Sequence, residues 1–228
     1  MNSNAATTTS LHSSFARPAV FIDRDGTISE EVGYVNHPSR YKVFPFAAEA
    51  IRLLNDAGWL AILVTNQAGV ARGYFSEELI HVVHDLLKAA LARGGARLDG
   101  IYYCPHHPTI GDAPYRQACD CRKPRPGLIT RAAAEHNIDL TRSWMIGDRY
   151  SDTELAHNAN LHAAFVLTGY GRGEWEFSRH SWTARGEPDM VAKNLLAAVR
   201  GILAGGRKVK TSEQSAAHDD EANRRGNR

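Results

Sequence analysis

The chain has 228 residues, 43% of them hydrophobic, so it is long and apolar enough to build one sizeable domain around a buried core. Its apolar runs are far shorter than the roughly 20 residues that a membrane-spanning helix needs, so we expect a soluble protein. The formal net charge of +2 comes from the basic excess in residues 205–228, and the rest of the chain is balanced. A balanced body offers no broad basic surface to nucleic acid. We therefore expect neither a nucleic-acid nor a membrane partner.

The two ends of the chain differ in composition from its middle. Residues 1–16 lack the basic and apolar regions of a secretory signal, so we expect a flexible tail and a cytoplasmic protein. Residues 205–228 contain no aromatic side chain and almost no aliphatic one, which predicts a disordered tail. Residues 17–204 are then expected to form the folded domain.

The first predicted element is a buried strand within "AVFIDRDGTI", residues 19–28, which ends at two aspartates and a glycine. A helix follows over residues 47–58, and "LAILVT", residues 60–65, reads as a strand covered on both faces. The next helix is predicted to begin after a cap at Ser76 and to end near Gly94 and Gly95. The spacing predicts that its buried face consists of Leu79, Val82, Val83, Leu86 and Leu87.

Strands and helices continue to alternate along the rest of the chain. We expect strands over "GIYYCP", "SWMIG" and "HAAFVLT", and helices over residues 127–136, 152–159 and 190–204. Such alternation predicts an α/β fold with a parallel, doubly wound, Rossmann-like sheet.

Polar residues recur where these strands end. Asp23 and Asp25 follow the first strand, Thr65 ends the second, and Asp148 follows "SWMIG". Ligands bind at the carboxyl ends of the strands in open α/β sheets, so these residues are expected to meet there. A cluster of Asp23, Asp25 and Asp148 is costly unless it is protonated or binds a hard cation, and its oxygen ligands suit Mg²⁺.

Four motifs, in this order, resemble those of the haloacid dehalogenase (HAD) superfamily of phosphotransferases: "DRDGT", "VTN", "CRKP" and "GDRYSD". Residues 18–170 further resemble the bacterial D-glycero-D-manno-heptose 1,7-bisphosphate phosphatases, and histidinol phosphatases share much of the pattern. The resemblance implies a HAD-type fold without a large cap domain. Ala68, Arg125 and Arg149 stand where relatives often carry Ser, His and Lys.

The resemblance also implies roles for individual residues. Asp23 is the expected nucleophile, Asp25 the general acid and base, and Thr65 and Lys123 the residues that stabilise the phosphoryl group. Mg²⁺ is expected on Asp23, Asp148 and the backbone carbonyl of Asp25. Contacts to the sugar and a distal phosphate are expected from Glu31, Val32, Gly33, Tyr34, Asn66, Gln67, Ala68, Arg122 and Arg149.

All three cysteines lie in one loop, residues 104–121, together with two histidines. An odd number of cysteines in a cytoplasmic protein argues against a disulfide framework, and Cys-x-His with Cys-x-Cys supplies four ligands for a structural Zn²⁺. The resemblance implies the set Cys104, His106, Cys119 and Cys121, using the first histidine of the pair. Buried free thiols are the alternative interpretation.

Together with these residues, the resemblance implies a monomeric, Mg²⁺-dependent phosphatase that removes the 7-phosphate of a heptose 1,7-bisphosphate through an aspartyl phosphate. The resemblance places that reaction in the biosynthesis of nucleotide-activated heptose, for lipopolysaccharide core or surface glycan. A histidinol-phosphate phosphatase is the alternative within the same class. A zinc-bearing interaction module without catalysis is the alternative from another class, although it leaves the residues at the strand ends unexplained.

Overall fold

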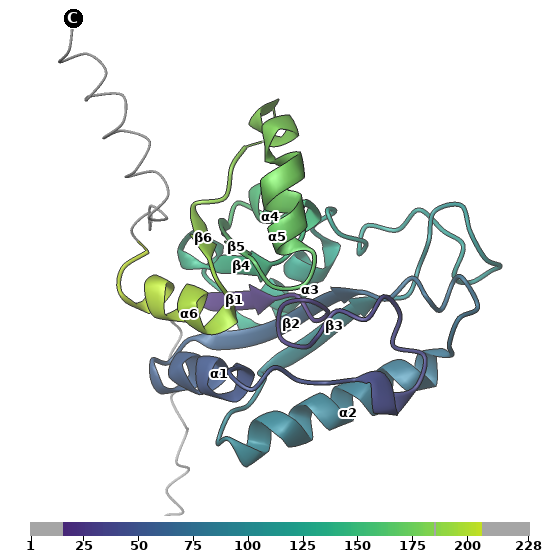
Figure 1. Ribbon diagram of the computed structural model, residues 1–228, viewed down its shortest axis with the longest axis horizontal. Helices are drawn as coiled ribbons and strands as arrows, with labels where there is room; N and C mark the ends of the chain where they lie inside the picture. Colours follow the sequence, from purple (N-terminus) through teal and green to yellow (C-terminus); the bar gives the residue numbers. More distant parts are fainter. Residues whose placement is uncertain (1–15, 185, 207–228) are drawn as a thin grey trace, which may run out of the picture.

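Six parallel strands form one central sheet in the computed structural model, which describes residues 16–184 and 186–206 (Figure 1). The strands are β1 (Ala19–Ile22), β2 (Leu60–Asn66), β3 (Gly100–Cys104), β4 (Trp144–Gly147), β5 (His162–Val166) and β6 (Met190–Ala192). Their order is β3-β2-β1-β4-β5-β6, and every neighbouring pair is parallel. The predicted doubly wound parallel sheet is therefore confirmed, with its switch point beside β1.

Helices cover both faces of the sheet. The helices α1 (Ala47–Asp56), α2 (Glu77–Arg93) and α6 (Leu195–Leu203) share one apolar core, and α3 (Gly127–His136) and α4 (Tyr150–Asn158) share the other. Strand β1 serves both cores, because Val20 and Ile22 face the first while Ala19 and Phe21 face the second. This double coverage explains why the strand is a continuous apolar run without alternation.

The buried face of α2 differs from the prediction. Its fully buried apolar residues are Ile80, Val83, Leu87 and Leu91, whereas Val82 and Leu86 are 46% and 43% exposed. The predicted residues and the buried residues both follow helical spacing. The buried face also includes the polar His84, so its hydrophobic pattern is less evident in the sequence. The helix does begin after Ser76, but that side chain makes no capping hydrogen bond.

The C-terminal part of the domain also differs from the prediction. The helix expected over residues 190–204 is two elements, β6 followed by α6, because Met190–Ala192 pairs with β5 and the Asn194 side chain caps the new helix. Between β5 and β6 lies a helical segment that the sequence had not predicted, which projects from the sheet (green in Figure 1). It contains α5 (Gly171–Gly173), η3 (Glu174–Ser178) and η4 (Arg179–Ala184).

The loops after β1, β2, β3 and β4 leave the sheet at its carboxyl edge, and the loop that follows β3 is the longest of them (teal in Figure 1). The shorter helices η1 (Pro38–Arg40) and η2 (Leu140–Arg142) lie in connections. In the described part of the chain, no helix combines the length and apolar character that crossing a bilayer requires. The tails expected over residues 1–16 and 205–228 lie almost entirely outside the described residues, so their expected flexibility stays a prediction.

Candidate active site

Asp23 lies directly after β1 and pairs with the ammonium group of Lys123. The Lys123 Nζ is 2.6 Å from Asp23 Oδ1 and 2.7 Å from Asp152 Oδ1, and all three side chains are at most 10% exposed. Proximity to both carboxylates raises the pKa of Lys123 above its ordinary value despite burial, so the lysine stays charged. One buried cation thus joins the ends of β1 and the first turn of α4.

A second arrangement fixes the backbone beside this lysine. The Lys123 amide donates to Asn66 Oδ1 at 3.0 Å, and Asn66 Nδ2 donates back to the Lys123 carbonyl at 3.2 Å. Asn66 is the last residue of β2, so the sheet itself determines where the lysine stands. Asn66 and Lys123, each predicted separately as a site residue, are therefore brought together.

Three carboxylates converge at this edge: Asp23, Asp148 and Asp152, with one oxygen of each within 4.8 Å of the others. Burial, with the neighbouring carboxylates adding to it, raises the pKa of Asp148 to about 9, and burial raises that of Asp23 to about 7. Three buried acidic groups share a single lysine, which leaves a deficit of positive charge. The donor set and the charge both fit a hard divalent cation such as Mg²⁺.

Glycines make room for these carboxylates. A Cβ atom on Gly26 or on Gly169 would lie 2.2 Å from Asp148 Oδ2, and Gly26 has a φ of +84°. Thr27 and the backbone amide of Tyr170 both donate to Asp148, at 3.5 Å and 2.8 Å. Asp148 is therefore fully buried, in space that a side chain at either glycine would occupy.

Asp25 does not join this cluster through its side chain, in contrast to the prediction. Its carboxylate accepts hydrogen bonds from the buried guanidinium of Arg24, the shortest at 2.8 Å, and from Gln67 Nε2 at 2.9 Å. The same Gln67 amide lies 2.9 Å from the Thr65 hydroxyl. The carboxylate of Asp25 is therefore bound by Arg24 and Gln67 and stays outside the cluster. The third carboxylate of the cluster is that of Asp152, where the sequence analysis had expected Asp25.

The predicted residues surround a cavity of about 470 Å³. Its walls include the predicted residues Asp23, Asp25, Glu31, Gly33, Tyr34, Thr65, Asn66, Ala68, Arg122, Lys123 and Arg149. Three predicted residues do not line it: Val32 packs against the core, Gln67 lies behind Asp25, and Asp148 is fully buried. The size suits a phosphorylated sugar.

The walls also include residues that the sequence analysis missed: Arg72, Ser151, Asp152, Tyr170 and Glu174. Asp152 ends the motif "GDRYSD" that had already been singled out, so the motif itself carried the signal. Tyr170 and Glu174 come from the segment after β5, for which no pattern was identified. Glu174 Oε1 lies 3.3 Å from Arg149 Nε, and the Arg149 guanidinium stacks 4.5 Å from the Tyr170 ring centre.

The cysteine loop brings its expected ligand atoms together. The sulfur atoms of Cys104 and Cys119 are 3.5 Å apart, those of Cys119 and Cys121 are 3.1 Å apart, and His106 Nδ1 is 3.3 Å from Cys121 Sγ. A hydrogen bond with Cys104 and burial raise the pKa of the Cys121 thiol well above its ordinary value. Four such atoms within 4.8 Å of one another match the donor set of a tetrahedral zinc site. His107 points elsewhere, toward Arg72.

Comparison with known proteins finds close relatives. A D-glycero-D-manno-heptose-1,7-bisphosphate 7-phosphatase of Thermosynechococcus vestitus is 42% identical over 190 residues, which cover 82% of this chain and 95% of that protein. An Escherichia coli K12 D-glycero-beta-D-manno-heptose-1,7-bisphosphate 7-phosphatase is 42% identical over 63% of this chain and 75% of its own length. Residues 120–198 match the family described as HAD-hydrolase-like.

A solved structure agrees with these relatives. The D,D-heptose 1,7-bisphosphate phosphatase of B. bronchiseptica, crystallised with magnesium and phosphate, has a TM-score of 0.71 to this chain and 31% sequence identity. The match covers 82% of this chain and 98% of that one. That relative therefore binds magnesium and phosphate.

Proposed function

Since this chain belongs to the D-glycero-D-manno-heptose 1,7-bisphosphate 7-phosphatase family of the HAD superfamily, we propose that it hydrolyses the 7-phosphate of that sugar bisphosphate. The observation that carries the proposal is the buried Lys123, which pairs with Asp23 and Asp152 beside Asp148 at the floor of an arginine-lined cavity. A structural ion pair alone does not need a third buried carboxylate or an open cavity above it.

In the proposed reaction, Asp23 attacks the phosphorus atom in line with the bond to the sugar oxygen. The new bond from the Asp23 carboxylate to phosphorus forms as the sugar oxygen leaves, and Asp25 gives that oxygen a proton. Asp25 then takes a proton from water, which attacks the aspartyl phosphate and releases inorganic phosphate. These roles of Asp25 are supported by its position in the lining of the same cavity as Asp23.

The negative charge on the phosphoryl group has to be stabilised by several hydrogen-bond donors or cations. We assign to the Thr65 hydroxyl and the Lys123 ammonium the role of hydrogen-bond donors to the phosphoryl oxygens. Both residues line the cavity. Asp23, Asp148 and the Asp25 carbonyl are assigned to Mg²⁺, with Asp152 holding Lys123 in place. When bound, the ion offsets the repulsion between carboxylate and phosphate and polarises the phosphoryl oxygens.

Contacts with the rest of the substrate are assigned to the cavity walls. Glu31, Gly33, Tyr34, Asn66 and Ala68 line the cavity, and Arg122 and Arg149 supply positive charge to it. Arg149 reaches the cavity while it is paired with Glu174, so part of its charge is already compensated. The segment after β5 thereby takes part in substrate recognition through Tyr170 and Glu174.

We propose Zn²⁺ for the cysteine loop, as a structural ion bound by Cys104, His106, Cys119 and Cys121. The donor set supports this proposal. Arg122 and Lys123, which follow Cys121 directly in the sequence, line the cavity, so an ion bound there would hold the backbone beside the cavity in place. Thiolate ligands need reducing conditions, which favours the cytoplasm as the place of action. We also propose a monomer whose catalytic domain is residues 17–204, the range that contains every residue lining the cavity.

The test is phosphate release from the α and β anomers of D-glycero-D-manno-heptose 1,7-bisphosphate and from histidinol phosphate, measured side by side with Mg²⁺. We expect kcat/KM to be highest for one heptose anomer. A higher value for histidinol phosphate would overturn the substrate assignment while leaving the reaction class standing. No release from any of the three would overturn the function itself.

A further inference from the structure

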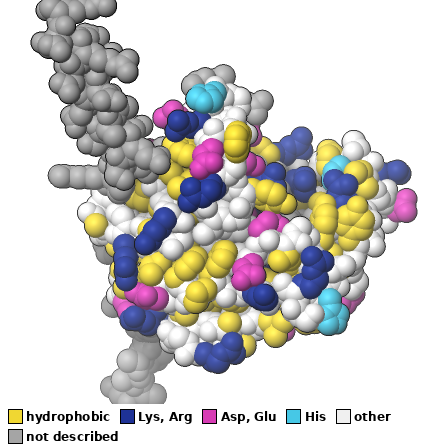
Figure 2. Space-filling view, in the orientation of Figure 1, with side chains coloured by type: hydrophobic (Ala, Val, Ile, Leu, Met, Phe, Trp, Pro, Cys, Tyr) yellow, Lys and Arg dark blue, Asp and Glu magenta, His cyan; other side chains and the backbone are white. Residues whose placement is uncertain are grey.

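A buried arginine pairs with Asp25, the proposed acid and base. Arg24 is only 2% exposed and is the largest of the fully buried side chains, whereas Figure 2 shows many lysine and arginine side chains in contact with solvent. Among the described residues, Asp25 is the only carboxylate that forms an ion pair with Arg24. The guanidinium also lies 5.7 Å from the ring centre of Tyr41. A charge that is buried at such cost is matched to a single partner.

The Asp25 carboxylate is held mainly through one of its two oxygens. Arg24 Nη2 lies 2.8 Å and Gln67 Nε2 lies 2.9 Å from Asp25 Oδ2. Arg24 Nε is shared between the two oxygens, at 3.0 Å from Oδ1 and 3.2 Å from Oδ2. Three N–H groups therefore reach Oδ2, and Oδ1 is the oxygen that keeps a free acceptor position.

These donors hold the carboxylate from outside the cavity. Asp25 lines the cavity, and neither Arg24 nor Gln67 is among the described residues of its wall. A carboxyl group that carries its proton on Oδ1 still accepts hydrogen bonds on Oδ2. The same contacts therefore hold Asp25 both before and after it gives up a proton.

Gln67 ties this arrangement to the sheet. Its backbone amide donates to the Cys104 carbonyl, at the end of β3, at 2.7 Å. Its side-chain Nε2 reaches both Asp25 Oδ2 and Thr65 Oγ1 at 2.9 Å. Because the Thr65 hydroxyl accepts from Gln67, its own hydrogen stays available for a phosphoryl oxygen. One amide group thus links the proposed acid and base to the proposed phosphoryl donor.

The turn that carries Asp25 is already fixed by its backbone. The Arg24 carbonyl accepts from the amides of Ile28 at 3.0 Å and Ser29 at 3.1 Å, and from the Ser29 hydroxyl at 3.1 Å. A buried ion pair, moreover, often contributes no more stability than apolar side chains of similar volume. The Arg24 guanidinium is therefore not needed to form the turn, and its contacts point to a role in the reaction.

We infer that Arg24 and Gln67 are positioning residues, which hold the Asp25 carboxylate by Oδ2 so that Oδ1 meets the leaving-group oxygen. The inference rests on the proposed function, because it takes Asp25 as the acid and base. Position matters in this role, since proton transfer requires the two heavy atoms to lie within about 2.6 to 3.2 Å of each other. The planar fork of an arginine fixes the orientation of a carboxylate better than a point charge does.

The experiment compares a substrate that needs a proton on its leaving group with one that does not. The sugar oxygen of heptose 1,7-bisphosphate leaves as an alcohol, whereas p-nitrophenyl phosphate releases a stabilised phenolate. For Arg24→Met we expect kcat/KM for the bisphosphate to fall at least about thirtyfold, since a positioned acid contributes roughly 100- to 10,000-fold. The kcat/KM for p-nitrophenyl phosphate should change less than about threefold, because it reports only the steps up to departure of the phenolate.

The second half of the reaction supplies an independent readout. Water attack on the aspartyl phosphate needs Asp25 whichever leaving group has departed, so kcat for p-nitrophenyl phosphate should also fall about thirtyfold in Arg24→Met. Rapid mixing should then show a burst of about one phenolate per chain before the slow steady state. A residue that only supports the fold would lower both kcat/KM values together and give no burst.

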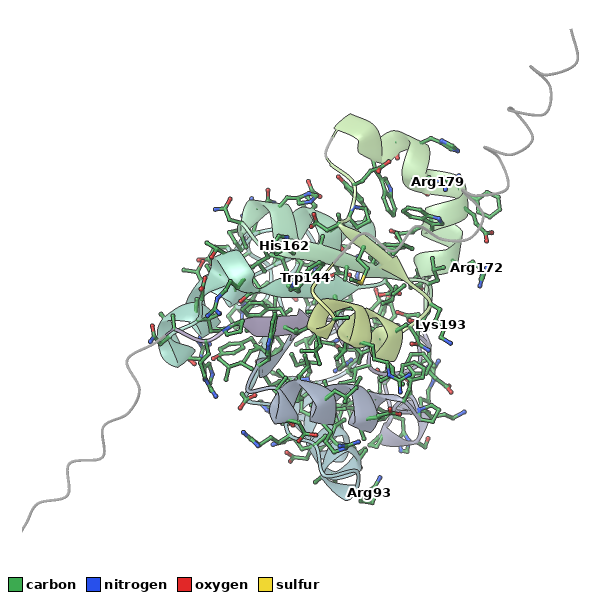
Figure 3. The ribbon with its side chains drawn as sticks, turned by 90° about the vertical axis from the view of Figure 1, so that its left-hand side faces the viewer. Arg93, Trp144, His162, Arg172, Arg179 and Lys193 are labelled. Carbon is green, nitrogen blue, oxygen red and sulfur yellow. The ribbon has the colours of Figure 1, made fainter. Side chains whose placement is uncertain are left out.

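Two milder variants keep the test decisive if Arg24→Met does not fold. Arg24→Lys keeps the positive charge beside Asp25 but replaces the fork by one ammonium group, so we expect a loss of about tenfold in kcat/KM for the bisphosphate. Gln67→Met changes no charge and should lower the same value about three- to tenfold, the effect of one neutral hydrogen bond. Arg93→Gln, at the exposed C-terminal end of α2 (Figure 3), is the matched control and should change nothing.

Equal losses on the two substrates in the variants of Arg24 and Gln67 would overturn the inference, because they would assign both residues to the structure of the whole site. Unchanged kinetics in these variants would overturn it as well. If the wild-type chain releases phosphate from neither substrate, the proposed function fails, and the positioning role fails with it. If the wild type hydrolyses only p-nitrophenyl phosphate, the choice of sugar fails, and the presence or absence of the burst in Arg24→Met still decides the role of Arg24.

Discussion

At the scale of single residues, the site depends on charges that are buried together. Asp23 is 7% exposed and Asp148 fully buried, and they share the neighbourhood of one lysine. Desolvation alone would protonate such carboxylates near neutral pH, so Lys123 and a divalent cation are needed to keep Asp23, the proposed nucleophile, charged. The same burial that raises the pKa of Asp23 to about 7 also strengthens every contact with a phosphoryl group.

The first prediction concerns Asp23, the proposed nucleophile. Asp23→Asn keeps the size of the side chain but removes its nucleophilic oxygen, so we expect kcat to fall by roughly four orders of magnitude or more. The fold should be kept, because a buried charge is replaced by a neutral amide. Asp56→Asn, in an exposed ion pair with Arg52, is the matched control and should retain full activity. Turnover within tenfold of wild type would remove Asp23 from its role.

The second prediction concerns His84, which lies buried on α2 with its Nε2 unpartnered. Burial, aided by the positive charge of Arg24, lowers its pKa from 6.5 to about 3. Between those values the unfolded chain binds a proton that the folded chain does not, so the stability from neutral His84 is present above pH 6.5 and is lost as pH falls toward 3. The loss is about 1.4 kcal/mol per pH unit.

His84→Leu should therefore flatten the fall in the free energy of unfolding between pH 6.5 and pH 4, as measured by urea denaturation. The exposed His180→Gln serves as the control and should keep the wild-type slope. An unchanged slope in His84→Leu would show that other groups cause the acid sensitivity.

Several residues of the site could be predicted from the sequence because each one stands next to a buried strand. Asp23, Thr65 and Asp148 follow or end apolar runs, and the parallel register then forces them to one edge. The pairing of Asp25 with Arg24 and the approach of Glu174 to Arg149 could not be predicted. Both depend on side-chain directions and on a segment without periodic pattern, which local sequence does not specify.

At the scale of elements, the cysteine loop links the sheet to the cavity. It begins at Cys104, the last residue of β3, which pairs with Asn66 of β2. Its other end leads into Arg122 and Lys123, which line the cavity. A metal that closes this loop would stabilise the native state and fix both cationic side chains.

The third prediction is one zinc ion per chain, measured by elemental analysis of protein purified without chelators. Cys119→Ser should lose the ion and lower the melting temperature, because a structural zinc contributes directly to folding. Asp112→Asn, an exposed residue in the same loop, should keep both the zinc and the stability. Purified wild type without zinc would refute the metal site and leave the free-thiol interpretation.

The elements themselves differ in how well the sequence predicts them. α3 spans Gly127–His136, as expected, because its periodicity is clear and its ends carry Pro126 and Asn137. β6 was missed because three residues give too little pattern, and only its pairing with β5 makes it a strand. The buried face of α2 was misjudged because hydrophobic periodicity ignores a buried histidine.

At the scale of the whole molecule, the candidate site residues lie at one edge of the sheet. Four strands deliver Asp23, Asn66, Cys104 and Asp148 to the same side, and the segment after β5 closes the cavity with Tyr170 and Glu174. The doubly wound order puts β1 at the switch point, where crossovers on the two sides diverge and leave room for a ligand. The architecture therefore gathers the residues that line the cavity at one edge of the sheet.

The central claim is Mg²⁺-dependent removal of the 7-phosphate by this site. The most direct measurement is phosphorus NMR of the products formed from D-glycero-D-manno-heptose 1,7-bisphosphate, with Mg²⁺ present or chelated. The account predicts that the signal of the 7-phosphate disappears while that of the anomeric phosphate remains, and that chelation stops the reaction. Loss of the anomeric phosphate, or hydrolysis that continues without a divalent cation, would contradict it.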